Sequence, residues 1–256
     1  MSTWPIDLPK TALEPAVRIA KVAIESWSRS AVAKATHEHV KVFVTVNRQP
    51  GVGAVSFSHK LAQRLKHDGQ GDWSPWNREL AEKVSAEHGI AKSIIEMIET
   101  RRDNWVEDLM QTISTSHVPS NFDEVHAYKL VVITIRALAI AGHAIIVGRG
   151  SLFVTEGMAG AIHLRLIAPL DHRINCVAER EKISLHEAAA KIVELDQLRA
   201  EFYRRYWPGK EIEPETFDMT LNTSKLSEDE LVECVLPAIR GRQKQLRSGG
   251  TKGLAK

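Results

Sequence analysis

The segment that most restricts the fold is VKVFVTVNRQPGVGAVSFSHKLAQRL, residues 40–65. It begins with an apolar, largely β-branched run, passes through a loop containing Gly51 and Gly53, and continues as an amphipathic pattern. A strand, a glycine loop and a helix in this order form a phosphate-binding loop, because a helix start offers unpaired backbone N–H groups and the positive end of its dipole. A GxG pair alone is a weak signal, so a plain strand-to-helix turn is the alternative interpretation.

The residues after this loop depart from the usual phosphate-loop formula. That formula places a lysine and then a serine or threonine after the last glycine; the lysine contacts the transferring phosphate and the hydroxyl holds Mg²⁺. Here Ala54 and Val55 occupy those positions, Ser56 carries the next hydroxyl, and Arg48 is a candidate substitute cation. The sequence predicts a phosphate site and leaves open whether that site supports turnover.

The rest of the chain alternates between strand and helix patterns. Four segments are predicted as strands: 40–46, 144–147, 161–167 and 218–222. The first three are apolar without clean alternation, which is typical of strands buried on both faces of a parallel sheet. Helical patterns are predicted at 56–66, 78–88, 91–113, 125–141 and 172–206, and Ser227-x-x-Glu230 predicts the cap of a last helix. This alternation predicts an α/β fold with a central parallel sheet.

Both ends of the chain differ from this pattern. Thr11-x-x-Glu14 predicts the capping box of an N-terminal helix. Its apolar stripe packs either on its own domain or on the same helix of a second copy, as a homodimer. The C-terminal end carries six Lys or Arg from residue 240 onward and no acid, and is predicted to be a flexible basic tail; a weak contact with a polyanion is the alternative.

Composition excludes several classes of protein. The net charge of +2 over 256 residues counts against a third interpretation, a nucleic-acid binder that acts through the basic tail. No run of 18 apolar residues predicts a membrane span, and the first residues lack the order of a signal peptide. Cys176 and Cys234 stand outside any CxxC pattern, which indicates a reducing compartment without a metal cluster. A cytoplasmic location is therefore expected.

The order of several blocks resembles the cytidylate kinase-like family, a branch of the nucleoside monophosphate kinases. The resemblance runs from about Val40 to Ile239. The blocks are NRQPGVG, WNRELAEKVSAEHGI, HAIIVGRGSLFV, APLDHRINCVAEREKIS, LDQLRAEFYRRYW and LNTSKLS. It implies a P-loop kinase fold in three layers, with a central parallel sheet, an NMP-binding insertion and a helical lid. It also implies ATP and Mg²⁺ as cofactors and a pyrimidine or related nucleotide as acceptor.

The resemblance divides the chain and distributes its binding residues. It implies a kinase-like domain at 40–240 and does not cover the other two predicted regions, the N-terminal helical extension at 1–39 and the tail at 241–256. For the donor ATP it implies phosphate contacts from one loop: Arg48, Gln49, Gly51 and Gly53, with Ser56 as the candidate Mg²⁺ ligand. For the acceptor nucleotide it implies Arg78 and Arg149.

The predicted lid contains Asp196, Arg199, Arg204 and Arg205. Because Asp196 and Arg199 are three residues apart on one helix, we expect the carboxylate to hold the guanidinium in place. The family pattern implies that Arg199 and Arg205, together with Arg48, neutralise the transferring phosphoryl group. For each arginine the alternative is a solvated or salt-bridged surface residue.

Two functions from different classes follow. The first is a nucleotide kinase that transfers the γ-phosphoryl group of ATP to a small acceptor, by positioning and charge neutralisation. The second is a catalytically degenerate kinase-fold sensor that binds the nucleotide without turnover. Ala54 and Val55 are the residues that discriminate between them.

Overall fold

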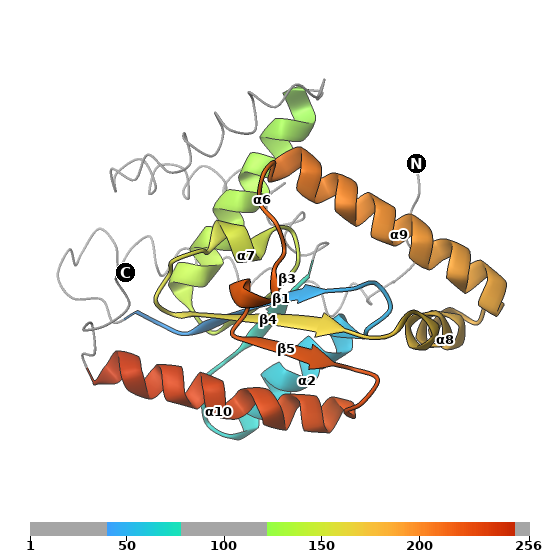
Figure 1. The fold of residues 1–256 in the computed structure, drawn as a ribbon. Coiled ribbons are helices and arrows are strands. Elements are labelled where there is room, and N and C mark those ends of the chain that lie inside the picture. The colour runs from blue at the N-terminus through green and yellow to red at the C-terminus, as the bar shows by residue number, and fades with distance from the viewer. Residues whose placement is uncertain (1–39, 78–121, 249–256) are drawn as a thin grey trace, which may run out of the picture.

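A central sheet of five parallel strands organises the molecule (Figure 1). The computed structural model describes residues 40–77 and 122–248. The strands lie in the order β2-β3-β1-β4-β5. They are β1 (Phe43–Arg48), β2 (Ser74–Trp76), β3 (Ala144–Val147), β4 (Ala161–Ile167) and β5 (Met219–Asn222). β1 lies between β3 and β4 and runs parallel to both. The carboxyl ends of these three strands therefore lie at one edge of the sheet, where open α/β sheets bind ligands.

Helices cover both faces of the sheet (Figure 1). One core contains Val44 and Val46 and is closed by α2 (Ala54–His67) and α10 (Glu228–Arg247). The other contains Phe43 and Ile146 and is closed by α6 (Phe122–Ala141), α7 (Ser151–Val154) and the end of α9 (Leu185–Tyr206). Side chains from β1 enter both cores because successive strand residues point to opposite faces. The architecture is the predicted three-layer α/β fold.

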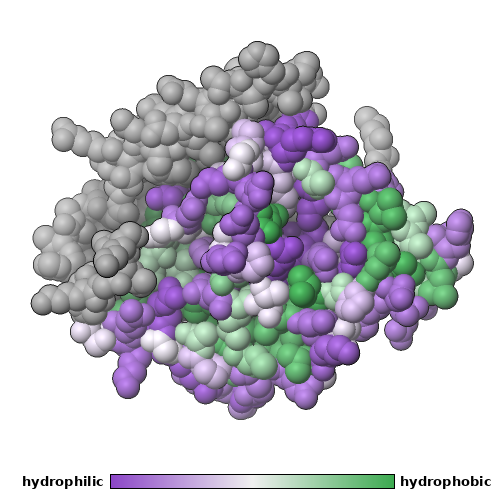
Figure 2. Space-filling model, in the orientation of Figure 1, coloured by the Kyte–Doolittle hydropathy of each residue, from purple (hydrophilic) through white to green (hydrophobic). Residues whose placement is uncertain are grey.

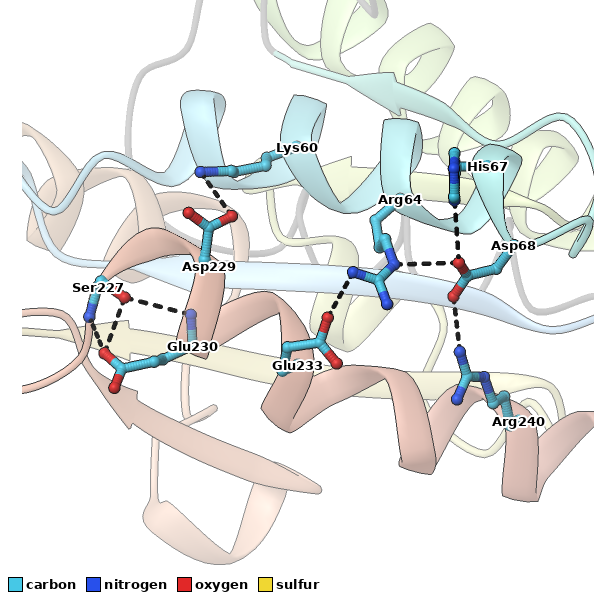
Figure 3. Close-up of polar contacts among 9 residues, drawn as sticks. All are labelled: Lys60, Arg64, His67, Asp68, Ser227, Asp229, Glu230, Glu233 and Arg240. Carbon is cyan, nitrogen blue, oxygen red and sulfur yellow. Dashed lines mark hydrogen bonds and ion pairs between the residues drawn. The ribbon is translucent and has the colours of Figure 1, made fainter.

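Ion pairs join α2 to α10 on the outside of one layer (Figure 3). Lys60 Nζ lies 2.8 Å from Asp229 Oδ1, and Arg64 Nη1 lies 2.7 Å from Glu233 Oε1. Asp68 accepts hydrogen bonds from Arg64 and from Arg240, whose Nη2 is 2.6 Å away. Each such surface pair contributes little alone, but together the pairs fix how α10 lies against the helix that follows the glycine loop.

Strand borders agree with the sequence where apolar runs are continuous. The predicted segments at 144–147 and 161–167 coincide with β3 and β4. β1 begins three residues later than predicted, because Val40 is half exposed and lies before the sheet. β2 was not predicted; it has three residues, contains Pro75 and lies at the sheet edge, where proline is tolerated.

The predicted helix at 172–206 is two helices, α8 (Leu170–Glu181) and α9. The chain reverses where Lys182 adopts a left-handed conformation (φ 56°), and Ser184 with Glu187 forms a capping box that starts α9. At the other end, α10 continues to Arg247, so the prediction of a flexible tail was wrong for residues 241–247. The N-terminal helix, the predicted helices at 78–88 and 91–113 and the NMP-binding insertion lie outside the described residues.

Candidate functional site

The glycine loop (residues 48–53) connects β1 to α2 at the carboxyl edge of the sheet. Gln49 anchors it to the end of β4: its backbone N–H donates to Leu166 (3.0 Å), and its side-chain oxygen accepts from the backbone N–H of Ala168 (2.9 Å). Gly53 is the N-cap of α2, with φ 72°. The loop thus presents the positive end of the α2 dipole at the sheet edge, as a phosphate site requires.

The α8–α9 hairpin (residues 170–206) packs directly on this loop. A Cβ atom on Gly51 would lie 2.8 Å from the carbonyl oxygen of Arg173 on α8 and 3.1 Å from the side chain of Ile192 on α9. Glycine is therefore required at residue 51 by close approach, whereas a Cβ at Gly53 would meet nothing within 4 Å. The hairpin occupies the place that the sequence predicted for the lid.

Three of the predicted arginines converge on the carboxyl ends of β1 and β3. The guanidinium of Arg48 lies over the turn after β3, where a Cβ on Gly148 would be 1.6 Å from Arg48 Nη1. Arg199 on α9 donates from Nη1 to the carbonyl oxygen of Arg48. Arg149 belongs to that same turn after β3. The structure thus places Arg199 of α9 in contact with Arg48 of β1, and Arg149 in the turn that the Arg48 guanidinium covers.

The surroundings of Arg199 are largely buried. Burial lowers the pKa of Arg199 and raises the pKa of Tyr203, one helical turn further along α9. The Tyr203 hydroxyl accepts a hydrogen bond from Asn47 Nδ2 at 3.0 Å. Charges in such a setting act on a bound anion more strongly than they would in water. Through Arg199 and Tyr203, one face of α9 contacts Asn47 and Arg48, the last two residues of β1.

The other two lid arginines lie further along α9. Arg205 is half-buried, with its Cζ atom 5.4 Å from the centroid of the Tyr206 ring. Arg204 is exposed. The predicted acceptor residue Arg78 lies outside the described residues, which end on that side at Asn77.

The expectation that Asp196 holds Arg199 was wrong. The Asp196 carboxylate accepts a hydrogen bond from Nη1 of Arg173 on α8, at 2.9 Å, and the Arg199 guanidinium is directed to β1. Arg173 is 7% exposed, and its Nε has no hydrogen-bond partner among the described residues. Sequence reasoning missed Arg173; its available signal was the position within APLDHRINCV, directly after β4.

The start of α2 offers few ligands for a magnesium ion. Ala54 is buried, Val55 is 41% exposed, and the Ser58 hydroxyl donates to the Ala54 carbonyl. Ser56, the predicted ligand, is an exposed hydroxyl on α2, and the Asp196 carboxylate of α9 is bound to an arginine. Within 40–77 and 122–248, no three His, Cys, Asp or Glu side chains are grouped to hold a metal. Magnesium prefers carboxylates and phosphate oxygens, so this donor set does not fit a protein-held ion.

The turn after β3 is named the GRG turn (residues 148–150). All three of its residues have positive φ, including the non-glycine Arg149 at 57°. The carbonyl oxygen of Arg149 accepts a hydrogen bond from the Tyr128 hydroxyl. The guanidinium carbon of Arg149 lies 5.7 Å from the centroid of the Phe202 ring. A left-handed conformation at a residue other than glycine is strained and persists only where its surroundings impose it. The turn is thus a built feature of this edge.

The sequence model of the cytidylate kinase-like family matches residues 43–225. The chain belongs to the cytidylate kinase-like family. The match includes the glycine loop, the GRG turn and the α8–α9 hairpin, and it begins and ends within a few residues of the sheet. Membership agrees with the expected P-loop kinase fold.

Two similar proteins of known name cover the chain very differently. A cytidylate kinase of Methanopyrus kandleri is 27% identical over 210 residues, which span 78% of this chain and 94% of that protein. A uronate isomerase of Corynebacterium glutamicum is 26% identical over 98 residues, which span 38% of this chain and 19% of that protein. The chain thus spans about a fifth of the isomerase. The match with the Methanopyrus kandleri kinase covers almost the full length of that kinase.

A solved structure supports the fold independently. An uncharacterised protein from Eubacterium ventriosum superposes with a TM-score of 0.58 at 16% identity, over 78% of this chain and 99% of the other. Identity at this level shows a shared fold and no more. None of the helices in the described ranges is long and apolar enough to cross a membrane.

Proposed function

We propose that the chain is a nucleotide kinase that transfers the γ-phosphoryl group of ATP to a nucleoside monophosphate, with a pyrimidine nucleotide as the first candidate. The observation that carries the proposal is the contact of Arg199 with Arg48 at the carboxyl edge of the sheet, beside the glycine loop, where the Arg48 guanidinium lies over the turn that contains Arg149. Family membership and the name of the archaeal relative agree with this reaction.

In this proposal the glycine loop binds the donor phosphates. The backbone N–H groups at the start of α2 receive phosphate oxygens, and Arg48 supplies the charge that the usual lysine would give. Arg149 binds the phosphate of the acceptor, and Arg199 with Arg205 stabilises the group in transfer. Magnesium arrives as part of the ATP–Mg²⁺ substrate, coordinated by phosphate oxygens.

A second candidate is a sensor that binds ATP without turnover. The observation that favours it is the start of α2, where Ala54 and Val55 provide neither an ammonium group nor a hydroxyl. Such a protein would keep the fold and the loop amides, and would report nucleotide through the position of the α8–α9 hairpin. The two candidates therefore differ in chemistry and agree in binding.

One set of measurements separates them. ADP release is followed with ATP–Mg²⁺ and each of CMP, dCMP, UMP, AMP and GMP, while melting temperature is followed against ATP–Mg²⁺. The kinase proposal expects ADP in proportion to one acceptor, together with a rise in melting temperature by mass action. A rise without ADP release, in both the wild type and an Ala54→Lys variant, favours the sensor. The absence of both ADP release and a rise in melting temperature at millimolar ATP would refute the phosphate-loop interpretation.

A further inference from the structure

A buried hydrogen-bond chain connects α9 to the GRG turn through a single tyrosine. The indole Nε1 of Trp207, the C-cap of α9, donates to the hydroxyl of Tyr128 at 2.9 Å. That hydroxyl donates to the carbonyl oxygen of Arg149 at 3.1 Å. Tyr128 is 5% exposed and Trp207 is 6% exposed, so water does not compete for these bonds. The Tyr128 hydroxyl is the central link of the chain, since it both accepts and donates.

The GRG turn is pressed onto this pair of aromatic residues. A Cβ atom on Gly150 would lie 2.4 Å from Trp207 Nε1 and 2.8 Å from the Tyr128 oxygen. The preceding residue, Arg149, holds a left-handed backbone that most side chains disfavour. Its carbonyl is the group that Tyr128 holds. The hydrogen bond from Tyr128 therefore offsets part of the conformational strain of the left-handed backbone at Arg149.

The same helix touches both halves of the candidate site. In its last two turns, α9 contacts the end of β1 through Arg199 and Tyr203. It contacts the GRG turn through Phe202, beside the Arg149 guanidinium, and through its C-cap Trp207. Phe202 and Tyr203 follow Arg199 by three and four residues, so these three side chains share one face of the helix. The hydrogen-bond chain fixes the turn relative to the helix that carries Arg199.

We propose that Tyr128 is a positioning residue for the acceptor phosphate. Through its hydroxyl it holds the GRG turn in the left-handed conformation and in register with α9, so that Arg149 faces a nucleoside monophosphate while Arg199 faces the donor. This role rests on the proposed function for its ligand. The physical restraint on the turn is independent of any nucleotide.

The variant that tests it is Tyr128→Phe, which removes the hydroxyl and keeps the buried ring. The matched control is Tyr206→Phe. The Tyr206 ring centroid lies 4.1 Å from that of Tyr128, but the Tyr206 hydroxyl is not part of the Trp207–Tyr128–Arg149 hydrogen-bond chain. With CMP as acceptor, the first variant should raise the KM for CMP about tenfold, the loss expected for one buried hydrogen bond. The KM for ATP should stay within twofold, and the control should leave both constants unchanged.

Amide hydrogen exchange at residues 150–154 gives the second readout and needs no nucleotide. The N–H groups of Phe153 and Val154 donate to the Gly150 carbonyl, so loosening of the turn will speed their exchange. Tyr128→Phe should exchange faster there than wild type, and Tyr206→Phe should not. Equal exchange in the two variants would overturn the proposal whether or not CMP is phosphorylated. Parallel increases in the KM values for CMP and ATP would also overturn it, since they indicate a general structural role.

Discussion

Arg199 has two functions in this structure that a single substitution would disturb together. Its guanidinium donates a hydrogen bond to the carbonyl oxygen of Arg48, which holds α9 over the glycine loop, and it places a half-buried positive charge there. We expect Arg199→Ala to lower kcat by roughly 30- to 1,000-fold, as about 2 to 4 kcal/mol of barrier is lost with one charge-assisted contact. ATP binding, measured by calorimetry, should change little because the loop amides remain.

Two controls make this prediction specific. Glu201→Ala alters an exposed residue on the same helix and should leave kcat unchanged. Arg199→Lys keeps the charge but loses the planar fork, so its kcat should lie between those of wild type and Arg199→Ala. A kcat for Arg199→Ala equal to that of Glu201→Ala would remove Arg199 from the proposed catalytic group.

The error over Asp196 shows what helix spacing can and cannot predict. Spacing identified correctly that Asp196 and Arg199 lie on neighbouring positions of one helix. It contained no information on α8, which places Arg173 against the same carboxylate. Likewise, the motif predicted Gly51 as a loop glycine, but its tight contact with Ile192 on α9 depends on a chain reversal at Lys182 that the periodicity did not reveal.

At the scale of elements, the α8–α9 hairpin has a small core of its own. Four buried residues form it, separate from the two cores of the sheet: Val177, Ala178, Ala188 and Ile192. Lys191 on α9 also bonds Glu181 on α8. Burial raises the pKa of Glu181, but the hydrogen bonds from Lys191 and Arg180 outweigh it and hold that pKa below its usual range. Because residues 170–195 have so little buried surface, this part of the hairpin is expected to open locally before the domain unfolds, while the end of α9 stays packed on the sheet.

Two matched capping boxes allow this to be tested. Ser184 starts α9 and Ser227 starts α10, each with a glutamate three residues later. Ser227→Ala should lower the free energy of unfolding in urea by about 1 kcal/mol, since α10 packs on a core of the sheet. Ser184→Ala should lower it less, and should instead speed amide exchange in residues 170–195. Equal losses in one cooperative transition, with no local exchange, would show that the hairpin unfolds with the domain.

Elements themselves were predictable to different degrees for physical reasons. β3 is a continuous apolar run buried on both faces, and β4 keeps a buried apolar row at Ile162, Leu164 and Leu166, so both patterns indicate strands. β2 is too short to show any period, and it exists because the edge of β3 offers Ser74 and its neighbours a partner. In the candidate site, Arg48, Arg149 and Arg199 were found from motifs, whereas Tyr128 and Trp207 were missed because their role depends on tertiary packing.

At the scale of the whole molecule, two histidines in the described part of the chain link stability to pH. Burial lowers the pKa of His143 and of His163. His163 lies in β4, where its Nδ1 is 2.7 Å from the Thr45 hydroxyl oxygen. Asp218 opposes the effect of burial on His163, and Arg242 adds to it. The native state therefore favours the neutral imidazole at both positions.

The sign of the effect follows from proton binding. Below the ordinary histidine pKa of about 6.5, the unfolded chain binds protons that the folded protein does not, so stability falls as pH falls through that value. Carboxylates titrate near pH 4, so between pH 7.5 and 5.5 the histidines dominate the change of stability with pH.

We expect the urea midpoint to fall between pH 7.5 and 5.5 at constant m value. His163→Asn, whose amide oxygen can still meet Thr45, should flatten that slope. The control is His59→Asn, which changes an exposed residue on α2 and should keep the wild-type slope. An unchanged slope in His163→Asn would show that the half-buried imidazole of His163 does not govern the acid sensitivity of the fold.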